Sequence, residues 1–362
     1  MTIARIETFT HDDICIVRVR TKDGREGIGQ TALYQTDLVA AVLHRQIAPH
    51  AFGADADDLD ALSDRCIERN YKYPGTYVCR ALSGVDTALW DLRAKREGKS
   101  VCELLGGAPG SLRVYASSLL RELTPDAAAA EAARLRDESF TAMKVRIATP
   151  CGRDRDLWPG RTEAVIPAVR KAVGDGVELL ADANCGYTPK RAIEVGRRLE
   201  QHGFRHFEEP CPYWEFEWTA EVAAALDMDV AGGEQDYDLA KWRRMIRAGT
   251  FDVAQPDVCY VGGFTRALRV AALAHAAGLP CVPHSSSQSL IAVFTLHLLG
   301  AIPNAGPYME FRYRPHPRTA GLFDPPLTIE AGRLRIPDGP GWGVTVNPAW
   351  LESAERRVSE VA

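Results

Sequence analysis

The feature that most constrains the fold is a regular alternation of short apolar runs and helical segments from residue 114 onward. The apolar runs are VYASS (114–118), AMKVRI (142–147), ELLADAN (178–184), FRHFEEP (204–210), DVAGGEQ (229–235), FDVAQPD (251–257), PCVPHS (280–285) and PYMEF (307–311). The intervening segments carry helix signals: Thr188-Pro189 is typical of a helix start and Gly203 of a helix end. Apolar runs separated by helices of roughly 10–15 residues indicate βαβ units and a parallel sheet. The pattern therefore predicts an α/β fold, a TIM-type (β/α)₈ barrel or one whose last unit is incomplete.

The first part of the chain has a different texture. Residues 14–30 alternate apolar and polar side chains around Asp23-Gly24, which predicts a hairpin, and helical spacing follows in 37–48, 55–69 and 81–105. A Gly- and Pro-containing linker then precedes the barrel. We therefore expect three segments: an α+β domain over 1–112, a barrel over 113–319, and a tail over 320–362 that packs back on the first domain.

Composition excludes several classes of protein. The 362 residues are 46% hydrophobic and 25% charged, with a net charge of −5, which argues against a disordered chain, a nucleic-acid binder or a membrane-surface protein. The longest near-apolar stretch, 290–302, is too short to span a bilayer, and no secretory signal is visible at the start. The nine cysteines form no CxxC pair, so we expect reduced, mostly buried thiols and a cytoplasmic enzyme.

Polar residues recur at the ends of the predicted strands. Asp182, Glu208 and Glu234 lie 26 residues apart, and the series continues with Asp257, His284 and Glu310. Lys144 and Arg146 lie two residues apart on an earlier strand, so both side chains point to one face. Consecutive strand ends are neighbours on the catalytic face of a barrel, so these side chains are expected to line one mouth.

The residue types indicate a chemistry for that mouth. Three carboxylates without a nearby thiol favour Mg²⁺ over zinc, although acids after strands can also simply cap the following helices. Asp257 could hold and polarise the imidazole of His284 for proton transfer, whereas a lone histidine is more often a core residue. For Lys144 and Arg146 the structural alternative is an ion-pair network in the barrel interior.

Two further interpretations concern less regular positions. Glu310 could merely pair with Arg312 or Arg314. The long segment 151–161 would overhang the mouth, so Arg153 is a candidate substrate-binding residue, or else part of a solvated loop. Tyr71 and Lys72, in the first domain, are candidates for closing the site from above.

Taken together, the motifs resemble the enolase superfamily, and within it the mandelate racemase subgroup. The resemblance covers nearly the whole chain and rests on ALSGVDTALWDL with ELLGG, Lys144-Val145-Arg146, Asp182-Ala183-Asn184, Glu208-Glu209-Pro210, Gly233-Glu234, Gln255-Pro256-Asp257, His284 and Met309-Glu310. It implies a modified (β/α)₇β TIM barrel with an α+β capping domain and Mg²⁺ on Asp182, Glu208 and Glu234. It also implies abstraction of the proton next to a carboxylate through a metal-stabilised enediolate. Lys144 would then supply positive charge, Asn184 would bond the substrate, and Glu310 would share a proton with the substrate carboxylate.

Arg146 departs from the pattern of the racemases in this family, which carry a second lysine there. Arginine is a poor general base in water, and a racemase needs a base on each face of the α-carbon. We therefore expect an acid-sugar (aldonate or aldarate) dehydratase in which His284 acts as base, acid or both, with Arg146 a less favoured base. The alternatives are a racemase, epimerase or lactone cycloisomerase on the same site, and a barrel that binds a metal and an acid without turnover. We further expect a homo-oligomer.

Overall fold

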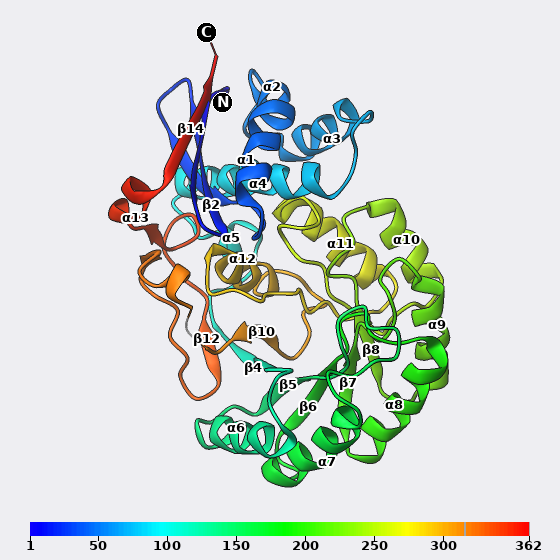
Figure 1. Ribbon diagram of the computed structural model, residues 1–362. Coiled ribbons are helices and arrows are strands. Elements are labelled where there is room, and N and C mark those ends of the chain that lie inside the picture. Colours follow the sequence, from blue (N-terminus) through cyan, green and yellow to red (C-terminus); the bar gives the residue numbers. More distant parts are fainter. Residues whose placement is uncertain (315, 362) are drawn as a thin grey trace.

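The computed structural model describes residues 1–314 and 316–361, and Figure 1 shows a barrel with a smaller α+β layer packed against one side of it. The smaller layer contains an antiparallel sheet of order β14-β1-β2-β3. Its strands are β1 (Ile3–His11), β2 (Ile14–Thr21), β3 (Glu26–Gln30) and, from the other end of the chain, β14 (Glu355–Glu360). The predicted hairpin is confirmed, with Gly24 at a φ of 87° in its turn.

The helices of this capping domain match the sequence pattern only in part. Their bounds are α1 (Thr36–Val42), a π-helical turn η1 (Leu43–Ile47), α2 (Ala48–Ala51), α3 (Leu59–Arg69), α4 (Thr76–Glu97) and α5 (Val101–Leu104). The predicted helix over 37–48 is confirmed as a continuous helical segment from 36 to 51, with the π-helical turn placed just before Pro49, which has no N–H to donate. The predicted helix over 81–105 is wrong as one element, because Gly98 is left-handed at a φ of 65° and ends α4.

Helix α4 joins the two layers and is buried on most of its surface. Its approach to the sheet depends on glycines: a Cβ on Gly84 would lie 2.4 Å from Val17 Cγ2, and one on Gly29 would lie 2.3 Å from Thr87 Oγ1. On the side facing the barrel, the indole N–H of Trp90 donates to Thr265. Trp90 and Asp86, which accepts from the backbone N–H of Thr265, are therefore the residues of ALSGVDTALWDL that bond to the barrel.

The barrel sheet has the order β10-β4-β5-β6-β7-β8-β9, all parallel. Its strands are β4 (Ser111–Leu119), β5 (Ala142–Arg146), β6 (Glu178–Asp182), β7 (Phe204–Glu208), β8 (Asp229–Gly232), β9 (Val253–Ala254) and β10 (Met309–Arg312). The run 280–285 was predicted as a strand, but it makes only isolated parallel bridges, Ala254 to Cys281, Asp257 to His284 and Cys281 to Ala305. These bridges connect β9 to the segment before β10 and complete the ring.

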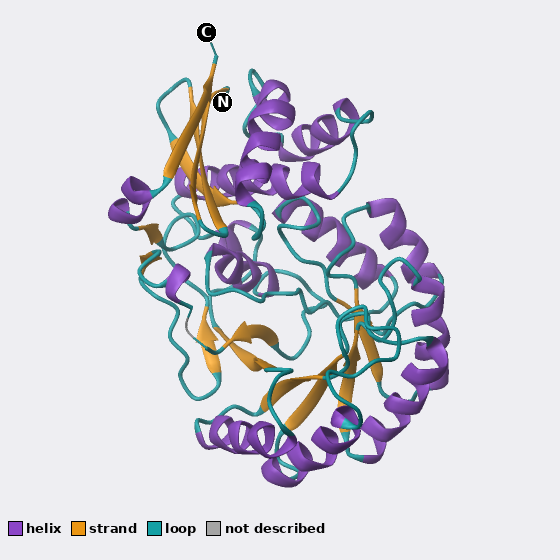
Figure 2. Ribbon diagram, in the orientation of Figure 1, coloured by secondary structure: helices purple, strands orange, loops and turns teal. Residues whose placement is uncertain are grey.

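Helices cover the outside of the ring, as Figure 2 shows. They are α6 (Pro125–Asp137), α7 (Arg161–Val173), α8 (Pro189–Gln201), α9 (Phe216–Ala225), α10 (Leu239–Arg247), α11 (Phe264–Ala276) and α12 (Leu290–Leu299). Helix α12 is buried along its whole length, and no helix within the described residues could cross a membrane. Because β10 has no helix of this ring after it, the architecture is the modified (β/α)₇β barrel with a capping domain.

The tail runs back across both parts of the molecule. It contains a 3₁₀ turn η2 (Pro317–Thr319), β11 (Phe323–Asp324), β12 (Arg333–Arg335), β13 (Thr345–Val346) and α13 (Pro348–Ser353), followed by β14. Strand β12 pairs with β4 of the barrel, whereas β14 pairs with β1 of the cap. The two chain ends consequently lie close together in Figure 1.

Candidate active site

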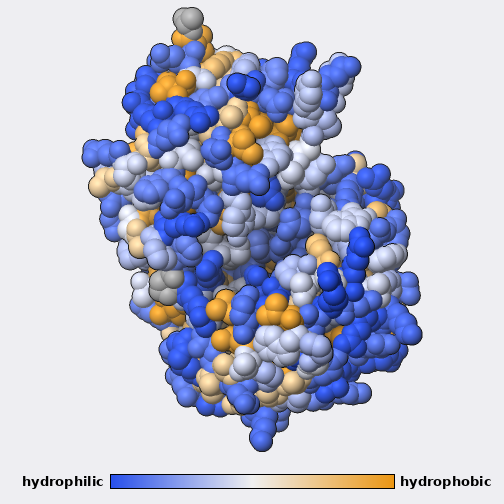
Figure 3. Space-filling view, in the orientation of Figure 1, coloured by the Kyte–Doolittle hydropathy of each residue, from blue (hydrophilic) through white to orange (hydrophobic). Residues whose placement is uncertain are grey.

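A cavity of about 460 Å³ opens at the carboxyl ends of the barrel strands. It is lined by Tyr34, Ser117, Leu120, Arg146, Pro150, Cys151, Asn184, Cys185, Glu209, Tyr213, Glu234, Gln235, Tyr260, His284, Ser286, Arg312 and Arg314. The molecular surface is mostly hydrophilic in the view of Figure 3 and is hollowed between the cap and the barrel. In an α/β barrel this is the face on which catalytic residues gather.

Three buried carboxylates stand at successive strand ends of this mouth. Asp182 is opposite Glu208 in the register of β6 and β7, and Glu234 follows β8. Burial together with repulsion from Glu208 raises the pKa of Asp182. Burial also raises the pKa of Glu234 to about 7, supported by repulsion from Glu208 and Asp182 and opposed by attraction to His284. Negative charge is therefore concentrated where it is costly to desolvate.

The chemistry of these donors fits a divalent cation. All three are carboxylates, each almost fully buried, and oxygen-only ligands of this kind suit Mg²⁺. As they stand, no three His, Cys, Asp or Glu side chains among the described residues are grouped closely enough to hold a metal ion. Two of the three carboxylates are instead engaged by other side chains. Glu208 is held by the ammonium of Lys144, and Glu234 Oε2 faces His284 Nε2 at 3.4 Å. A dication at Asp182, Glu208 and Glu234 would relieve the repulsion that raises two of the pKa values.

Lys144 is fixed on the same side of the barrel. Its Nζ donates to both oxygens of Glu208, at 2.7 and 2.9 Å, and lies 2.8 Å from Glu310 Oε1. Burial lowers its pKa, but the carboxylates of Glu208 and Glu310 outweigh burial and hold the pKa well above the ordinary value. The two carboxylates thus stabilise the charged ammonium form of Lys144.

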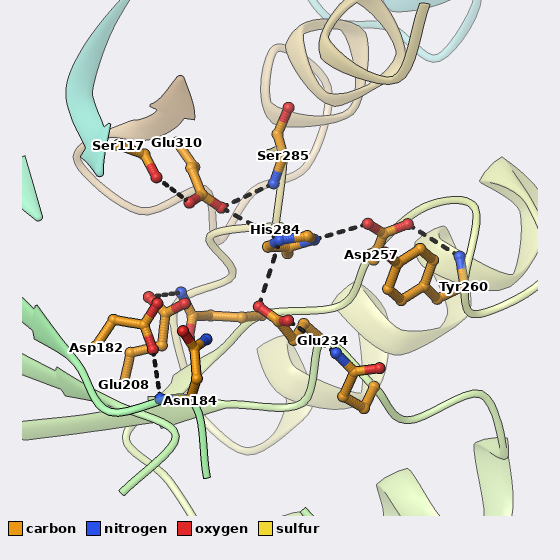
Figure 4. A network of polar contacts seen from close by, with 12 residues as sticks. Ser117, Asp182, Asn184, Glu208, Glu234, Asp257, Tyr260, His284, Ser285 and Glu310 are labelled. Carbon is orange, nitrogen blue, oxygen red and sulfur yellow. Dashed lines mark hydrogen bonds and ion pairs between the residues drawn. The ribbon is translucent and has the colours of Figure 1, made fainter. Parts of the chain in front are cut away.

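Glu310 is surrounded by hydrogen-bond donors. It accepts hydrogen bonds from Ser117 Oγ at 2.6 Å and from the backbone N–H of Ser285 at 2.9 Å, which Figure 4 shows. Burial raises its pKa, but attraction to Lys144 and His284 lowers the pKa by more. The sequence alternative in which Glu310 pairs with Arg312 or Arg314 is not what the structure shows.

Asp257 and His284 form a hydrogen-bonded pair on the other side of the mouth. His284 Nδ1 is 2.7 Å from Asp257 Oδ2, while Asp257 Oδ1 accepts from the backbone N–H groups of Cys259 and Tyr260. Because the carboxylate is fixed by these two amides, the imidazole donates from Nδ1 and presents Nε2 to the cavity. Burial lowers the pKa of His284, but Glu234, Glu310 and the bond to Asp257 raise the pKa well above its ordinary value.

Arg146 lies across the ring from this pair. Its Nε is 3.8 Å from Asp182 Oδ2 and has no hydrogen-bond partner among the described residues. Burial lowers its pKa, but Asp182 and Glu310 raise the pKa above the ordinary arginine value. The guanidinium stays charged, so the structure favours an electrostatic function of Arg146 over proton abstraction.

Asn184 is oriented by a residue that the sequence did not single out. It is left-handed, with a φ of 43°, and its Oδ1 accepts from Arg121 Nη2 at 2.7 Å. Arg121 is itself buried and donates to the carbonyl of Ile147. With its oxygen engaged, Asn184 has only its amide NH₂ to offer to the cavity. No periodic pattern surrounds Arg121, so nothing in the sequence could have identified it.

The structure does not bring the other three sequence candidates to the cavity. Arg153, Tyr71 and Lys72 are exposed and do not line it. Of loop 151–161 it is Cys151 that lines the cavity, and the backbone after it passes through left-handed residues, among them Arg153 with a φ of 51°. The capping domain contributes Tyr34 instead, from a left-handed turn that sequence periodicity does not reveal.

The chain matches two family models over most of its length. Residues 2–106 match the mandelate racemase / muconate lactonizing enzyme N-terminal domain, and residues 127–350 match the enolase C-terminal domain-like model. Arabinonate dehydratase of Saccharolobus solfataricus is 29% identical and covers 94% of this chain and 90% of its own. D-galactarolactone cycloisomerase of Agrobacterium fabrum is 36% identical and covers 74% of this chain and 71% of its own.

Solved structures with the same fold carry other descriptions as well. A crystal structure of a proposed racemase from Roseobacter denitrificans superposes with a TM-score of 0.98 at 53% identity and covers the whole of both chains. A mandelate racemase/muconate lactonizing protein from Paracoccus denitrificans PD1222, in complex with magnesium, superposes with a TM-score of 0.89 at 31% identity and covers 99% of both chains.

Proposed function

The chain belongs to the mandelate racemase / muconate lactonizing enzyme family of the enolase superfamily, and on that premise we propose that it is a magnesium-dependent acid-sugar dehydratase. The observation that carries the proposal is that the two sides of the barrel mouth hold different chemical groups. One side holds the imidazole of His284, hydrogen-bonded to Asp257. The other side holds the ammonium of Lys144, already bound by Glu208 and Glu310, and the guanidinium of Arg146, which is a poor general base. One base on one face suits elimination better than racemisation.

The proton steps follow from the positions of these side chains. His284 Nε2 takes the proton from the carbon next to the substrate carboxylate. Lys144, with Glu310 beside it, stands near the carboxylate oxygens and offsets their developing charge. The C3–O bond then breaks, His284 returns its proton to the departing hydroxyl, and water leaves. The resulting enol tautomerises to a 2-keto-3-deoxy acid.

Asp182, Glu208 and Glu234 would hold Mg²⁺ in this proposal. The dication supplies electrophilic stabilisation of the substrate carboxylate as its α-proton becomes acidic. The related Paracoccus protein in complex with magnesium supports this cofactor. The 2-keto-3-deoxy product is expected only from substrates with hydroxyl groups on both C2 and C3.

The test replaces His284 with Asn, with the exposed His275→Asn as the matched control. A set of acid sugars is screened with Mg²⁺ for 2-keto product by semicarbazide. We expect H284N to lose roughly 10²-fold or more of the activity, since one positioned acid–base group contributes that much, and H275N to keep it. Full elimination activity in H284N would disprove the assignment.

A lactone cycloisomerase is the second candidate, because a cycloisomerase is among the relatives. It would use the same base and the same enolate without loss of water. The substrate form and the product mass separate the two reactions. A 2-keto-3-deoxy acid formed from a lactone without loss of water would indicate cycloisomerisation, whereas the same kind of product formed from the open acid sugar with loss of water indicates dehydration. Deuterium at C2 in D₂O without a 2-keto product would indicate epimerisation.

A further inference from the structure

Arg312 is a cation at the outer rim of the cavity. It is the last residue of β10, in register with Ser117 of β4, and it follows Glu310 by two positions. Side chains two residues apart on a strand share a face, and Arg312 therefore lies on the cavity face about 6.6 Å further toward the mouth than Glu310.

The guanidinium of Arg312 has no hydrogen bond or ion pair within residues 1–314 and 316–361, although the side chain is half-buried. Its backbone carbonyl is engaged and accepts from Gln288 Nε2 at 2.7 Å, so the strand end itself is fixed. Arg314, on the same rim, differs: it is bound to Glu131 at 2.7 Å and to the hydroxyl of Tyr313. Of the two rim arginines, Arg312 is the one that is available to an anion.

The groups for one carboxylate are buried directly behind the cavity lining, where Glu310 accepts from Ser117 and lies 4.0 Å from His284. Lys144 lies there with Glu310, beside the carboxylates assigned to Mg²⁺. A second, separate cationic position is not needed for an acid sugar with a neutral terminal hydroxymethyl group. A planar guanidinium with free N–H groups matches a carboxylate, with two parallel hydrogen bonds.

We propose that the substrate is a dicarboxylic acid sugar, an aldarate, whose distal carboxylate is bound by Arg312. The inference rests on the proposed dehydratase function and chooses between its two substrate classes. The reacting carboxylate would lie at the Lys144 end and the distal one at the rim, with the hydroxyl-bearing chain between His284 and Arg146.

The experiment compares galactarate, D-glucarate and D-mannarate with the matched aldonates, in the presence of Mg²⁺. Both turnover to 2-keto acid and binding by titration calorimetry are measured. We expect the best aldarate to have a KM or Kd at least roughly tenfold below that of its aldonate, because a charge-assisted bidentate contact is lost in the latter. Arg312→Gln should remove this preference by raising the aldarate value roughly 10- to 100-fold while changing the aldonate value less than about threefold.

Arg205→Gln is the matched control, since Arg205 is an exposed arginine of β7 outside the cavity. Preference for aldonates, or an equal effect of R312Q on both classes, would overturn the inference while leaving a dehydratase. Selective binding of aldarates without turnover would support Arg312 and contradict the proposed function. Neither binding nor turnover of either class would contradict both. The wild-type preference is decisive on its own if R312Q does not fold.

Discussion

The barrel mouth and the joint between cap and barrel both bury polar side chains, but they satisfy them differently. In the joint, Asp86 accepts from the backbone N–H of Thr265, and the indole of Trp90 donates to the hydroxyl of Thr265. In the mouth, buried polar atoms of Arg146, Glu209, Gln255 and Ser285 have no partner among the described residues. A buried polar group without a partner is costly, so those in the mouth are groups that a bound ligand could satisfy.

Two buried histidines show the same contrast. His284 in the mouth faces carboxylates, which raise its pKa, whereas His297 in the joint has only neutral backbone partners. His297 Nδ1 accepts from the N–H of Cys102, and Nε2 donates to the carbonyl of Trp342. Burial therefore lowers the pKa of His297 to about 4. Equal burial gives opposite results because the neighbouring charges differ.

The largest expected effect comes from changing the tautomer in the mouth with Asp257→Asn. The variant can still accept the two backbone N–H groups at Oδ1, but its amide NH₂ now faces His284 Nδ1. The imidazole must then carry its proton on Nε2, where it can no longer take one from the substrate. We expect activity to fall roughly 10²- to 10⁴-fold, with a change of under about 1 kcal/mol in the free energy of unfolding. Retained activity would contradict the assigned role of the pair.

In the joint, the buried His297 should make the free energy of unfolding depend on pH. Because the pKa of His297 is about 4 in the fold and 6.5 when unfolded, the unfolded chain binds more protons between these values. The stabilisation is present above pH 6.5 and is lost as the pH falls toward 4. We expect about 2 kcal/mol of this loss between pH 8 and pH 5 in urea unfolding.

His297→Gln provides the comparison, since its side chain does not titrate and its unfolding should depend less on pH by that amount. The ring of His297 can also be followed directly by NMR. A midpoint near 6.5 in the folded protein would contradict the prediction, whatever the stability of the variant.

The features of the mouth that could be predicted from the sequence are those that follow from short, regular spacing of residues. Strand-end acids at regular spacing, and Lys144 with Arg146 on one strand face, require only the period of a strand and the order of a barrel. Contacts between residues that are far apart in the sequence could not be predicted in this way. The contact of β1 with β14 and the hydrogen bond from Arg121 to Asn184 join residues whose separation in sequence carries no periodic signal. Arg312 was considered only as a partner for Glu310, and the structure gives that partnership to Lys144.

Arg121→Gln should have an intermediate effect on substrate binding in the mouth. Without the guanidinium, Asn184 Oδ1 loses its hydrogen bond and the amide is free to turn over. We expect KM for the acid sugar to rise roughly tenfold, because the orientation of one substrate-binding amide is lost, with a smaller change in kcat. Arg136→Gln, on the exposed part of α6, is the control. An unchanged KM would show that Asn184 does not depend on Arg121.

The smallest effect is expected in the joint, from Thr265→Val. This substitution keeps the shape of the side chain but removes the hydroxyl that accepts from the indole N–H of Trp90 at 2.9 Å. The N–H would remain buried without a partner, so we expect the free energy of unfolding to fall by about 1 to 2 kcal/mol. Because Thr265 lies outside the cavity, kcat and KM should not change. A loss of activity at unchanged stability would mean that the joint positions the active-site residues. It would contradict the view that the joint affects stability alone.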